Sequence, residues 1–107
     1  MSQIRILDTL TNTKKELEFS DKVRIYLCGV TVYDQSHIGH ARTIIVFDTL
    51  RRFLEANDIS VELIQNFTDV DDKIINRAKE QGESVSGLST KYIQTYFEDS
   101  DGLNIKR

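Results

Sequence analysis

CGVTVYDQSHIGHAR, residues 28–42, contains the only cysteine of the chain and both of its histidines. A run of apolar and β-branched residues at 22–28 leads into it and predicts a strand. A longer segment with apolar residues three or four positions apart follows it and predicts a helix. Two histidines in a loop between a strand and a helix indicate a functional site at the edge of a sheet.

The helix is predicted over residues 40–57. Its segment TIIVF would also suit a buried strand, but the length of the pattern favours a helix. The first turns are apolar on several sides, so we expect them to be deeply buried and the end of the helix to be more exposed. The residues expected to share the buried face are Ile44, Phe47, Leu50 and Leu54.

Further elements are predicted on both sides of this unit. Residues 4–7 form a strand, and the polar stretch up to residue 19 suits a short hairpin arm. Residues 60–67 form the next strand, a helix from residue 72 ends at Gly82, and Ser84 begins another helix. In that last helix Leu88, Tyr92 and Tyr96 share a face. Strand, helix, strand and helix in this order predict an α/β fold with a parallel sheet.

The composition excludes several classes of protein. The chain has 107 residues, of which 39% are hydrophobic and 29% charged, as in a single globular domain. No apolar run is long enough to cross a bilayer, so no membrane partner is expected. A single cysteine excludes an intramolecular disulfide and favours a reducing, cytoplasmic location. The net charge of −3 gives no general attraction to nucleic acid.

His37 and His40 have the spacing that places two side chains on one face of a helical turn. At the start of a helix, unpaired backbone N–H groups and the helix dipole favour a phosphate. Two imidazoles would add donors for charge that builds up during a reaction. Gly39 lacks a side chain, so a flat ring such as adenine could lie against the backbone. The pattern predicts a site for a nucleoside triphosphate.

Two other interpretations of the histidines stay open at this point. They would suit ordinary polar positions on a loop. With Cys28 they would also offer three zinc ligands, although the close cysteine pairs of most zinc sites are absent. For Cys28 itself, a buried thiol at a strand end is the ordinary role. The phosphate interpretation is favoured because it accounts for the histidine spacing, for Gly39 and for the strand-to-helix position together.

Two charged clusters are interpreted as structural. Asp69, Asp71 and Asp72 precede or begin the helix at residue 72, where carboxylates interact favourably with the helix dipole without any Mg²⁺. Arg51 and Arg52 are expected on a solvated helix face rather than in an RNA-binding patch.

The motif HIGH at residues 37–40, between a strand and a helix, resembles the signature of class I aminoacyl-tRNA synthetases. The wider string YLCGVTVYDQSHIGHARTIIVFDTLRRFL at 26–54, with NFTDVDDKIINRA at 66–78, resembles the cysteine-specific members of that family. The resemblance extends over residues 6–105. It implies a Rossmann-like fold, a parallel sheet with flanking helices, of which residues 1–107 would be the N-terminal half.

The resemblance implies a cysteine–tRNA ligase, which uses ATP to activate L-cysteine as cysteinyl-adenylate and then transfers the cysteinyl group to tRNA(Cys). His37 and His40 would be catalytic and hold the phosphates of ATP, which carries Mg²⁺, while Gly39 would admit the adenine. Cys28 would be a Zn²⁺ ligand, and zinc would bind the thiolate of the substrate. The residues implied to bind cysteinyl-adenylate are Cys28, Gly29, Val30, Thr31, Thr43, Asn66, Phe67 and Thr68.

Three of these residues have simpler roles if the resemblance is set aside. Thr43 would bond back to its own helical turn, as hydroxyl side chains in helices often do. Asn66 and Thr68 would end a strand and cap a helix.

The resemblance also implies what the chain would lack. One cysteine does not complete a four-coordinate zinc site, so the other ligands are expected outside these residues and zinc binding by the chain alone is expected to be weak or absent. A loop of the KMSKS type and an anticodon-binding domain are not found in this sequence. The 107 residues also contain no proline, and they end abruptly at DGLNIKR. We therefore expect an incomplete chain that is inactive alone and binds tRNA weakly or not at all.

Two alternatives to this function stay open. A ligase that joins cysteine to an amino-sugar inositol shares the catalytic domain of the family. A non-catalytic module for binding a nucleotide or a partner, derived from a synthetase, would keep the fold without turnover.

Overall fold

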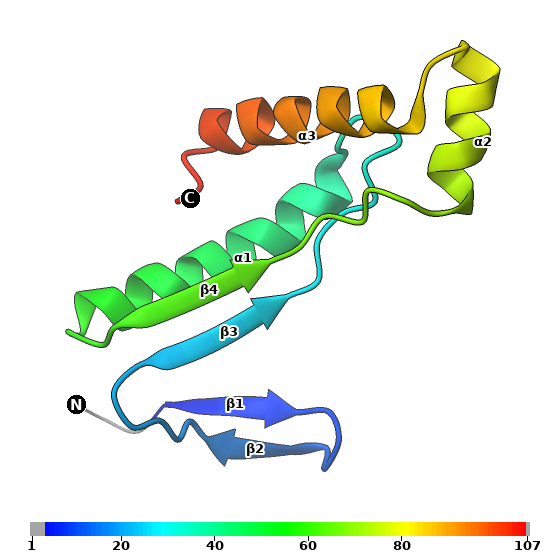
Figure 1. Ribbon diagram of the computed structural model, residues 1–107. Helices are drawn as coiled ribbons and strands as arrows, with labels where there is room; N and C mark the ends of the chain where they lie inside the picture. Colours follow the sequence, from blue (N-terminus) through cyan, green and yellow to red (C-terminus); the bar gives the residue numbers. More distant parts are fainter. Residues whose placement is uncertain (1–3, 107) are drawn as a thin grey trace.

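The computed structural model describes residues 4–106. Within these residues, seven elements follow one another (Figure 1): β1 (Arg5–Asp8), β2 (Thr13–Glu16), β3 (Val23–Leu27), α1 (Ile38–Ala56), β4 (Val61–Gln65), α2 (Asp72–Gln81) and α3 (Val85–Gly102). None of the helices in the described part of the chain is long and apolar enough to span a membrane.

The predicted hairpin arm is confirmed by the pairing of β1 with β2. The two strands are antiparallel, with Arg5 opposite Glu16 and Asp8 opposite Thr13. The Asp8 carboxylate closes the turn, because it accepts hydrogen bonds from the Leu10 N–H and the Thr11 hydroxyl. The hairpin lies at the lower side of the molecule in Figure 1, apart from the helices.

The predicted parallel sheet is confirmed in the pair β3 and β4, which α1 connects. Their register runs from Val23 opposite Val61 to Leu27 opposite Gln65. In both strands the odd-numbered side chains are buried or half-buried and the even-numbered ones are exposed. One face of the pair therefore packs against the rest of the chain, and the other carries the exposed side chains of Tyr26 and Ile64.

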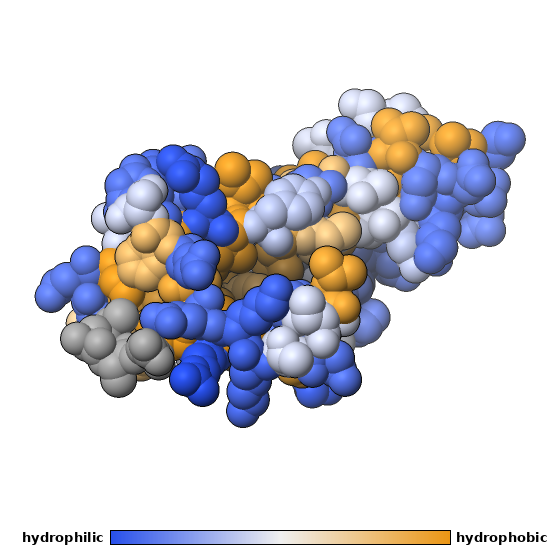
Figure 2. All heavy atoms as spheres, turned by 90° about the horizontal axis from the view of Figure 1, so that it is seen from below, coloured by the Kyte–Doolittle hydropathy of each residue, from blue (hydrophilic) through white to orange (hydrophobic). Residues whose placement is uncertain are grey.

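The prediction that α1 is most buried at its start is wrong. Ile38 is 87% exposed and Val46 55%, whereas Leu54 near the end of the helix is completely buried. The expected buried face is correct, since Ile44 and Leu54 are buried. A sheet of two strands covers only one side of a helix, so the apolar residues on the other sides of the first turns remain at the surface. On the face of the molecule seen in Figure 2, apolar surface is exposed among the polar side chains.

The ends of α2 and α3 follow the predicted capping signals. Gly82 ends α2 in the left-handed conformation, with φ of 65°. The Ser84 hydroxyl accepts a hydrogen bond from the Gly87 N–H at 3.0 Å and so caps the start of α3. The predicted buried face of α3 is also confirmed by Leu88, Tyr92 and Tyr96.

The buried apolar residues of the described part of the chain form two separate clusters rather than one core. One cluster joins the segment after β3 to α2 and α3, through Val32, Ile74, Ala78, Leu88 and Tyr92. The other joins the starts of β3 and β4 to the end of α1, through Val23, Leu54 and Ile59. The radius of gyration is 16.9 Å, whereas a compact domain of this length has about 13 Å. The molecule is therefore extended, with its helices only partly covered.

Candidate functional site

The predicted site residues lie beyond the carboxyl ends of β3 and β4, where open α/β sheets bind ligands. The chain after β3 leads to the start of α1, and the chain after β4 leads to α2. The two segments stay side by side, because Thr31 and Thr68 form a further parallel bridge beyond the strands. The Thr68 N–H donates to the Val30 carbonyl, and the Val32 N–H donates to the Thr68 carbonyl, both at 3.1 Å. The structure therefore brings Val30, Thr31 and Thr68 together.

Gly29 and Asn66 make the closest approach between these two segments. The Gly29 N–H donates to Asn66 Oδ1 at 2.7 Å. A Cβ atom on Gly29 would lie 1.4 Å from the Asn66 carbonyl oxygen. Only a residue without a side chain fits here, so the reason for Gly29 is the contact between two backbones.

Phe67 and Thr43, which are also implied to line the pocket, make contacts with the helices. Phe67 is half-buried, and its ring packs edge-to-face against Tyr96 at 5.2 Å between centroids. Thr43 is exposed, and its hydroxyl donates back to the Gly39 carbonyl at 3.4 Å. The helix-internal role considered for Thr43 is therefore the one observed.

The two histidines cap α1. His37 is the N-cap residue, and its Nδ1 accepts a hydrogen bond from the Gly39 N–H at 3.0 Å. His40 lies three residues on, and its Nδ1 accepts from the His37 N–H at 3.2 Å. This is a reciprocal capping box, formed by imidazoles in place of the usual hydroxyl and carboxylate. The rings stack with centroids 4.1 Å apart.

The capping box corrects one part of the sequence analysis. The predicted unpaired N–H groups at the start of α1 are partly used within the chain, since Gly39 donates to His37 Nδ1 and the His40 N–H donates to the His37 carbonyl. Because Nδ1 is the acceptor in both rings, the proton of each neutral imidazole lies on Nε2. The donors that the histidines offer to a ligand are therefore the two Nε2–H groups.

Gly39 also serves the capping box. A Cβ atom at this position would lie 2.7 Å from Cε1 of His37 and 3.0 Å from its Nδ1. A side chain here would displace the His37 ring from the helix end. The structure thus supplies a local reason for Gly39, in addition to the space for a nucleotide that the sequence suggests.

Burial lowers the pKa of the His40 imidazole below its ordinary value of 6.5, and the charge of His37 lowers that pKa further. The folded chain therefore takes up this proton at lower pH than the unfolded chain does. The resulting contribution to stability is complete above pH 6.5 and is lost as the pH falls through the folded-state pKa. The neutral form, which His40 needs to accept from the His37 N–H, is the form that folding favours.

We expect the urea midpoint of the chain to fall as the pH is lowered from about 7.5 to about 5. His40→Gln replaces the imidazole by an acceptor that does not titrate and suits the same capping position. This variant is expected to match the native chain at the higher pH and to lose stability less steeply below it. An equal pH dependence in both proteins would contradict a role for His40 in the pH effect.

A cavity of about 500 Å³ lies between the start of α1 and the end of α3. His37 and His40 line it on one side, and Glu98 and Asp99 on the other. The strand-end residues implied to bind cysteinyl-adenylate are not part of this lining. The structure therefore gathers the candidate residues in two groups. One is the histidine pair at the cavity, and the other consists of the residues that pair beyond β3 and β4.

Cys28 is exposed, and its thiol lies 3.8 Å from the Gly29 carbonyl oxygen. The ordinary role considered for it, a buried thiol, is therefore wrong. Within residues 4–106, no three His, Cys, Asp or Glu side chains come together as ligands for a metal ion. The interpretation of Cys28, His37 and His40 as one zinc site is not supported by this arrangement.

Two residues of the acidic cluster before α2 have the structural role expected for them. Asp71 is the N-cap of α2, and its carboxylate accepts a hydrogen bond from the Ile74 N–H at 3.0 Å. Asp72 lies in the first turn of the helix. Both positions favour a carboxylate at a helix start.

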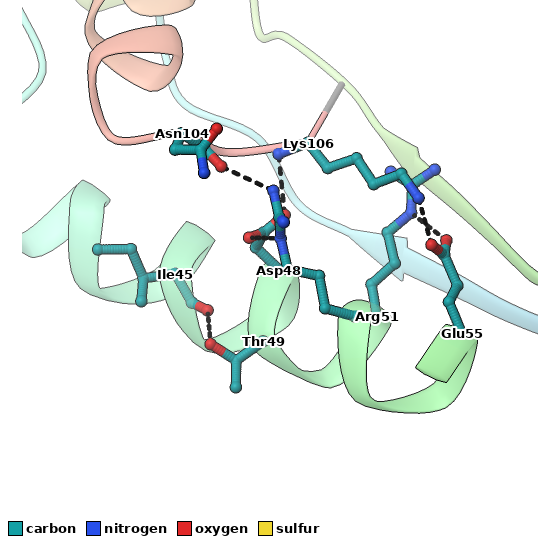
Figure 3. Close-up of polar contacts among 8 residues, drawn as sticks. Ile45, Asp48, Thr49, Arg51, Glu55, Asn104 and Lys106 are labelled. Atoms are coloured by element: carbon teal, nitrogen blue, oxygen red, sulfur yellow. Dashed lines mark hydrogen bonds and ion pairs between the residues drawn. The ribbon is translucent and has the colours of Figure 1, made fainter. Parts of the chain in front are cut away.

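The expectation for the arginine pair is correct only in part. The Arg51 side chain is 17% exposed and pairs with Glu55 at 3.1 Å. Arg52 is more exposed, pairs with Asp48 at 2.8 Å and also donates to the Asn104 carbonyl at 2.8 Å (Figure 3). Both ion pairs have the spacing of four residues that the sequence already shows. The hydrogen bond between Arg52 and Asn104, which holds the segment after α3, has no signal in the sequence.

Comparisons with known proteins agree with the motifs. The family model described as the tRNA synthetases class I (C) catalytic domain matches residues 14–107. The cysteine–tRNA ligase of Clostridioides difficile (strain 630) is 55% identical in an alignment of 107 positions that covers 97% of this chain. That of Geobacillus thermodenitrificans (strain NG80-2) is 50% identical in an alignment of 109 positions that covers the whole of this chain. The chain spans 23% of the length of each of these relatives.

The fold is also found in solved structures. Mycobacterium tuberculosis methionyl-tRNA synthetase in complex with methionyl-adenylate superposes with a TM-score of 0.72, at 20% sequence identity. The similarity covers 78% of this chain and 17% of that chain. At this identity the likeness concerns the fold alone, a small parallel sheet with helices.

Proposed function

Because the chain belongs to the family of class I (C) tRNA synthetase catalytic domains, we propose that residues 1–107 form the N-terminal, nucleotide-binding part of a cysteine–tRNA ligase with a Rossmann-like fold. The observation that carries this proposal is the pair of histidines at the start of α1, beyond the carboxyl end of a parallel strand pair. The substrates of the whole protein would be L-cysteine, ATP and tRNA(Cys).

The proposed reaction has two steps. A carboxylate oxygen of cysteine attacks the α-phosphorus of ATP, and the bond to the bridging oxygen breaks, so that pyrophosphate leaves. A hydroxyl of the terminal ribose of tRNA then attacks the carbonyl carbon of cysteinyl-adenylate, and AMP leaves. No covalent bond to the protein forms, so the contribution of these residues is to position the reactants and to stabilise charge.

His37 and His40 would act through their Nε2–H groups. The capping box holds both rings by Nδ1, so the donors are oriented before the ligand arrives. Donors that are already in place stabilise negative charge on a phosphate without further reorganisation. The carboxylates of Glu98 and Asp99 border the same cavity and would repel a free triphosphate. ATP is therefore expected to enter with its Mg²⁺, which offsets part of that repulsion.

The remaining roles are assigned by position. Gly39 would lie against the adenine. The residues that would surround the cysteinyl group of the adenylate are Cys28, Gly29, Val30, Thr31, Thr43, Asn66, Phe67 and Thr68. Most of them belong to the two segments that bridge beyond β3 and β4.

Zinc does not fit the residues that the structure describes. Cys28 offers one thiolate, and no second or third ligand lies with it in the described part of the chain. A structural or catalytic zinc site requires at least three protein ligands. If the whole protein holds Zn²⁺ at Cys28, the other ligands come from outside the described residues.

The proposal predicts that ATP with Mg²⁺ shifts the amide resonances of Ile38, Gly39 and Ala41 in an NMR titration of the chain. Replacing both histidines by alanine removes two hydrogen bonds to a charged group, so we expect the affinity to fall by at least about tenfold. Thr49→Ala, in the same helix but away from its start, is the matched control and should leave the affinity unchanged.

An equal affinity in the native chain and in the double variant would refute the proposed role of the histidines. Because His37 and His40 also cap α1, the helical circular dichroism of the double variant is measured first. His37→Asn provides a second variant, since it keeps a capping acceptor while it removes the Nε2–H donor.

A further inference from the structure

The loop of residues 33–36 connects the segment beyond β3 to the capping box of α1. On one side of the loop, Val32 is buried at 1% exposure. On the other side, His37 is the N-cap of α1. Gln35 and Ser36, within the loop, border the same cavity as the two histidines. The position of this loop therefore affects both the wall of the cavity and the entry of the chain into the cap.

Two cations of α2 contact the first two residues of the loop. Arg77 Nη2 lies 3.5 Å from Asp34 Oδ2. The guanidinium carbon of Arg77 is 5.8 Å from the centre of the Tyr33 ring, and the Lys73 ammonium nitrogen is 5.7 Å from the same centre. Both distances are within the range in which a cation is attracted to an aromatic ring. Because Lys73 and Arg77 are four residues apart, one face of α2 makes all these contacts.

The apolar cluster fixes α2 beside the loop. Ile74 and Ala78, which follow the two cations in the sequence, are 0% and 3% exposed and belong to the same cluster as Val32. Tyr33 is half-buried and packs against this cluster. In Figure 1 the chain after β3 runs toward the end of the molecule where α2 lies. The Arg77 guanidinium thus extends from a helix whose own position is set by buried side chains.

The Asp34 carboxylate connects Arg77 to the backbone of the loop. Its Oδ2 faces the guanidinium, and its Oδ1 accepts a hydrogen bond from the Gln35 N–H at 2.8 Å. Gln35 precedes the N-cap His37 by two residues. The ion pair therefore holds the backbone just before it enters α1.

We propose that Arg77 is a positioning residue for the histidine pair. By holding Tyr33 and Asp34, it fixes the loop and with it the place of the Nε2–H groups of His37 and His40. In the described residues Arg77 lies outside the lining of the cavity, so it acts through the loop and not by contact with a ligand. The inference rests on the proposed function, in which the Nε2–H groups bind the phosphates of ATP and need to be in place beforehand.

Titration of ATP with Mg²⁺ into Arg77→Gln and Asp34→Asn tests the proposal. Asparagine keeps an acceptor for the Gln35 N–H, so this variant removes the charge of the ion pair alone. We expect each variant to bind ATP at least about fivefold more weakly, because the histidine donors are misplaced. If Arg77 acted only as a charge that attracts ATP, loss of the Asp34 charge would strengthen binding instead. Opposite effects of the two variants, or unchanged affinity in Arg77→Gln, would overturn the proposal.

Two further variants serve as controls. Arg77→Lys keeps a cation beside Asp34 and is expected to bind ATP within about twofold of the native chain. Arg24→Gln removes another surface ion pair, with Glu62 at 3.2 Å, and should leave the affinity unchanged. Exposed ion pairs contribute little to stability, so the urea midpoints of all these variants are expected to change little.

Amide hydrogen exchange tests the positioning without ATP. The Gly39 N–H donates to His37 Nδ1, so its exchange reports on the His37 ring. We expect this exchange to be about fivefold faster in Arg77→Gln, while that of Leu50, in the middle of α1, stays the same. Unchanged exchange at Gly39 with ATP binding intact would refute this inference alone. Faster exchange in a chain that does not bind ATP would support the positioning and refute the proposed function.

Discussion

Gly29→Ala is expected to lower the free energy of unfolding by more than about 3 kcal/mol, a large part of the stability of a small domain. The added Cβ atom would lie 1.4 Å from the Asn66 carbonyl oxygen and 2.6 Å from its carbon. These are backbone atoms, so no side-chain rotation relieves the overlap. The two segments beyond β3 and β4 must separate, which also breaks the hydrogen bond from the Gly29 N–H to Asn66 Oδ1.

Urea unfolding followed by circular dichroism measures this effect. Gly102→Ala is the matched control, because a Cβ atom on Gly102 meets nothing within 4 Å. At that position alanine is expected to be neutral or to stabilise by up to about 1 kcal/mol. If the two variants unfolded at the same urea concentration, the close approach of Gly29 to Asn66 would be refuted.

Leu54→Ala is expected to cost about 3 kcal/mol. Leu54 is completely buried and belongs, with Val23 and Ile59, to the cluster that joins the end of α1 to the sheet. Truncation removes apolar contacts and leaves a cavity, and such changes cost about 2–5 kcal/mol in other proteins. The cluster is small, so few other side chains compensate for the loss.

The control for Leu54 lies in the same helix. Ile45 is 42% exposed, so Ile45→Ala is expected to change the free energy of unfolding by less than about 0.5 kcal/mol. Thermal or urea unfolding of both variants gives the comparison. Equal losses of stability in Leu54→Ala and Ile45→Ala would contradict the observed burial along α1, in which Leu54 is buried and Ile45 is exposed. The apolar pattern of the sequence had instead predicted that the start of the helix is the more buried end.

Much of the local structure could be predicted from neighbouring residues. The apolar period identified α1, and glycine or serine at the expected positions identified the end of α2 and the start of α3. The apolar and β-branched runs at 22–28 and 60–67 predicted the strands that the structure has at 23–27 and 61–65. These signals depend on interactions between residues that are close in the sequence, so they can be recognised without the tertiary structure.

The candidate site was predictable in position but not in detail. The spacing of His37 and His40 located it at the start of α1. That both rings accept hydrogen bonds through Nδ1, and so present Nε2–H, depends on the dihedral angles of the helix end. No pattern of residue types specifies those angles. For the same reason the role of Gly39 beside the His37 ring emerged only from the geometry.

The sequence by itself therefore determined the elements of this protein, their order and the place of the histidine motif, because helix periods, strand alternation and caps act over short distances along the chain. The tertiary structure alone decided which end of α1 is buried, why Gly29 tolerates no side chain, and how Asp48 and Arg52 hold the segment after α3. Each of these depends on residues far apart in the chain that folding brings within a few ångströms of one another.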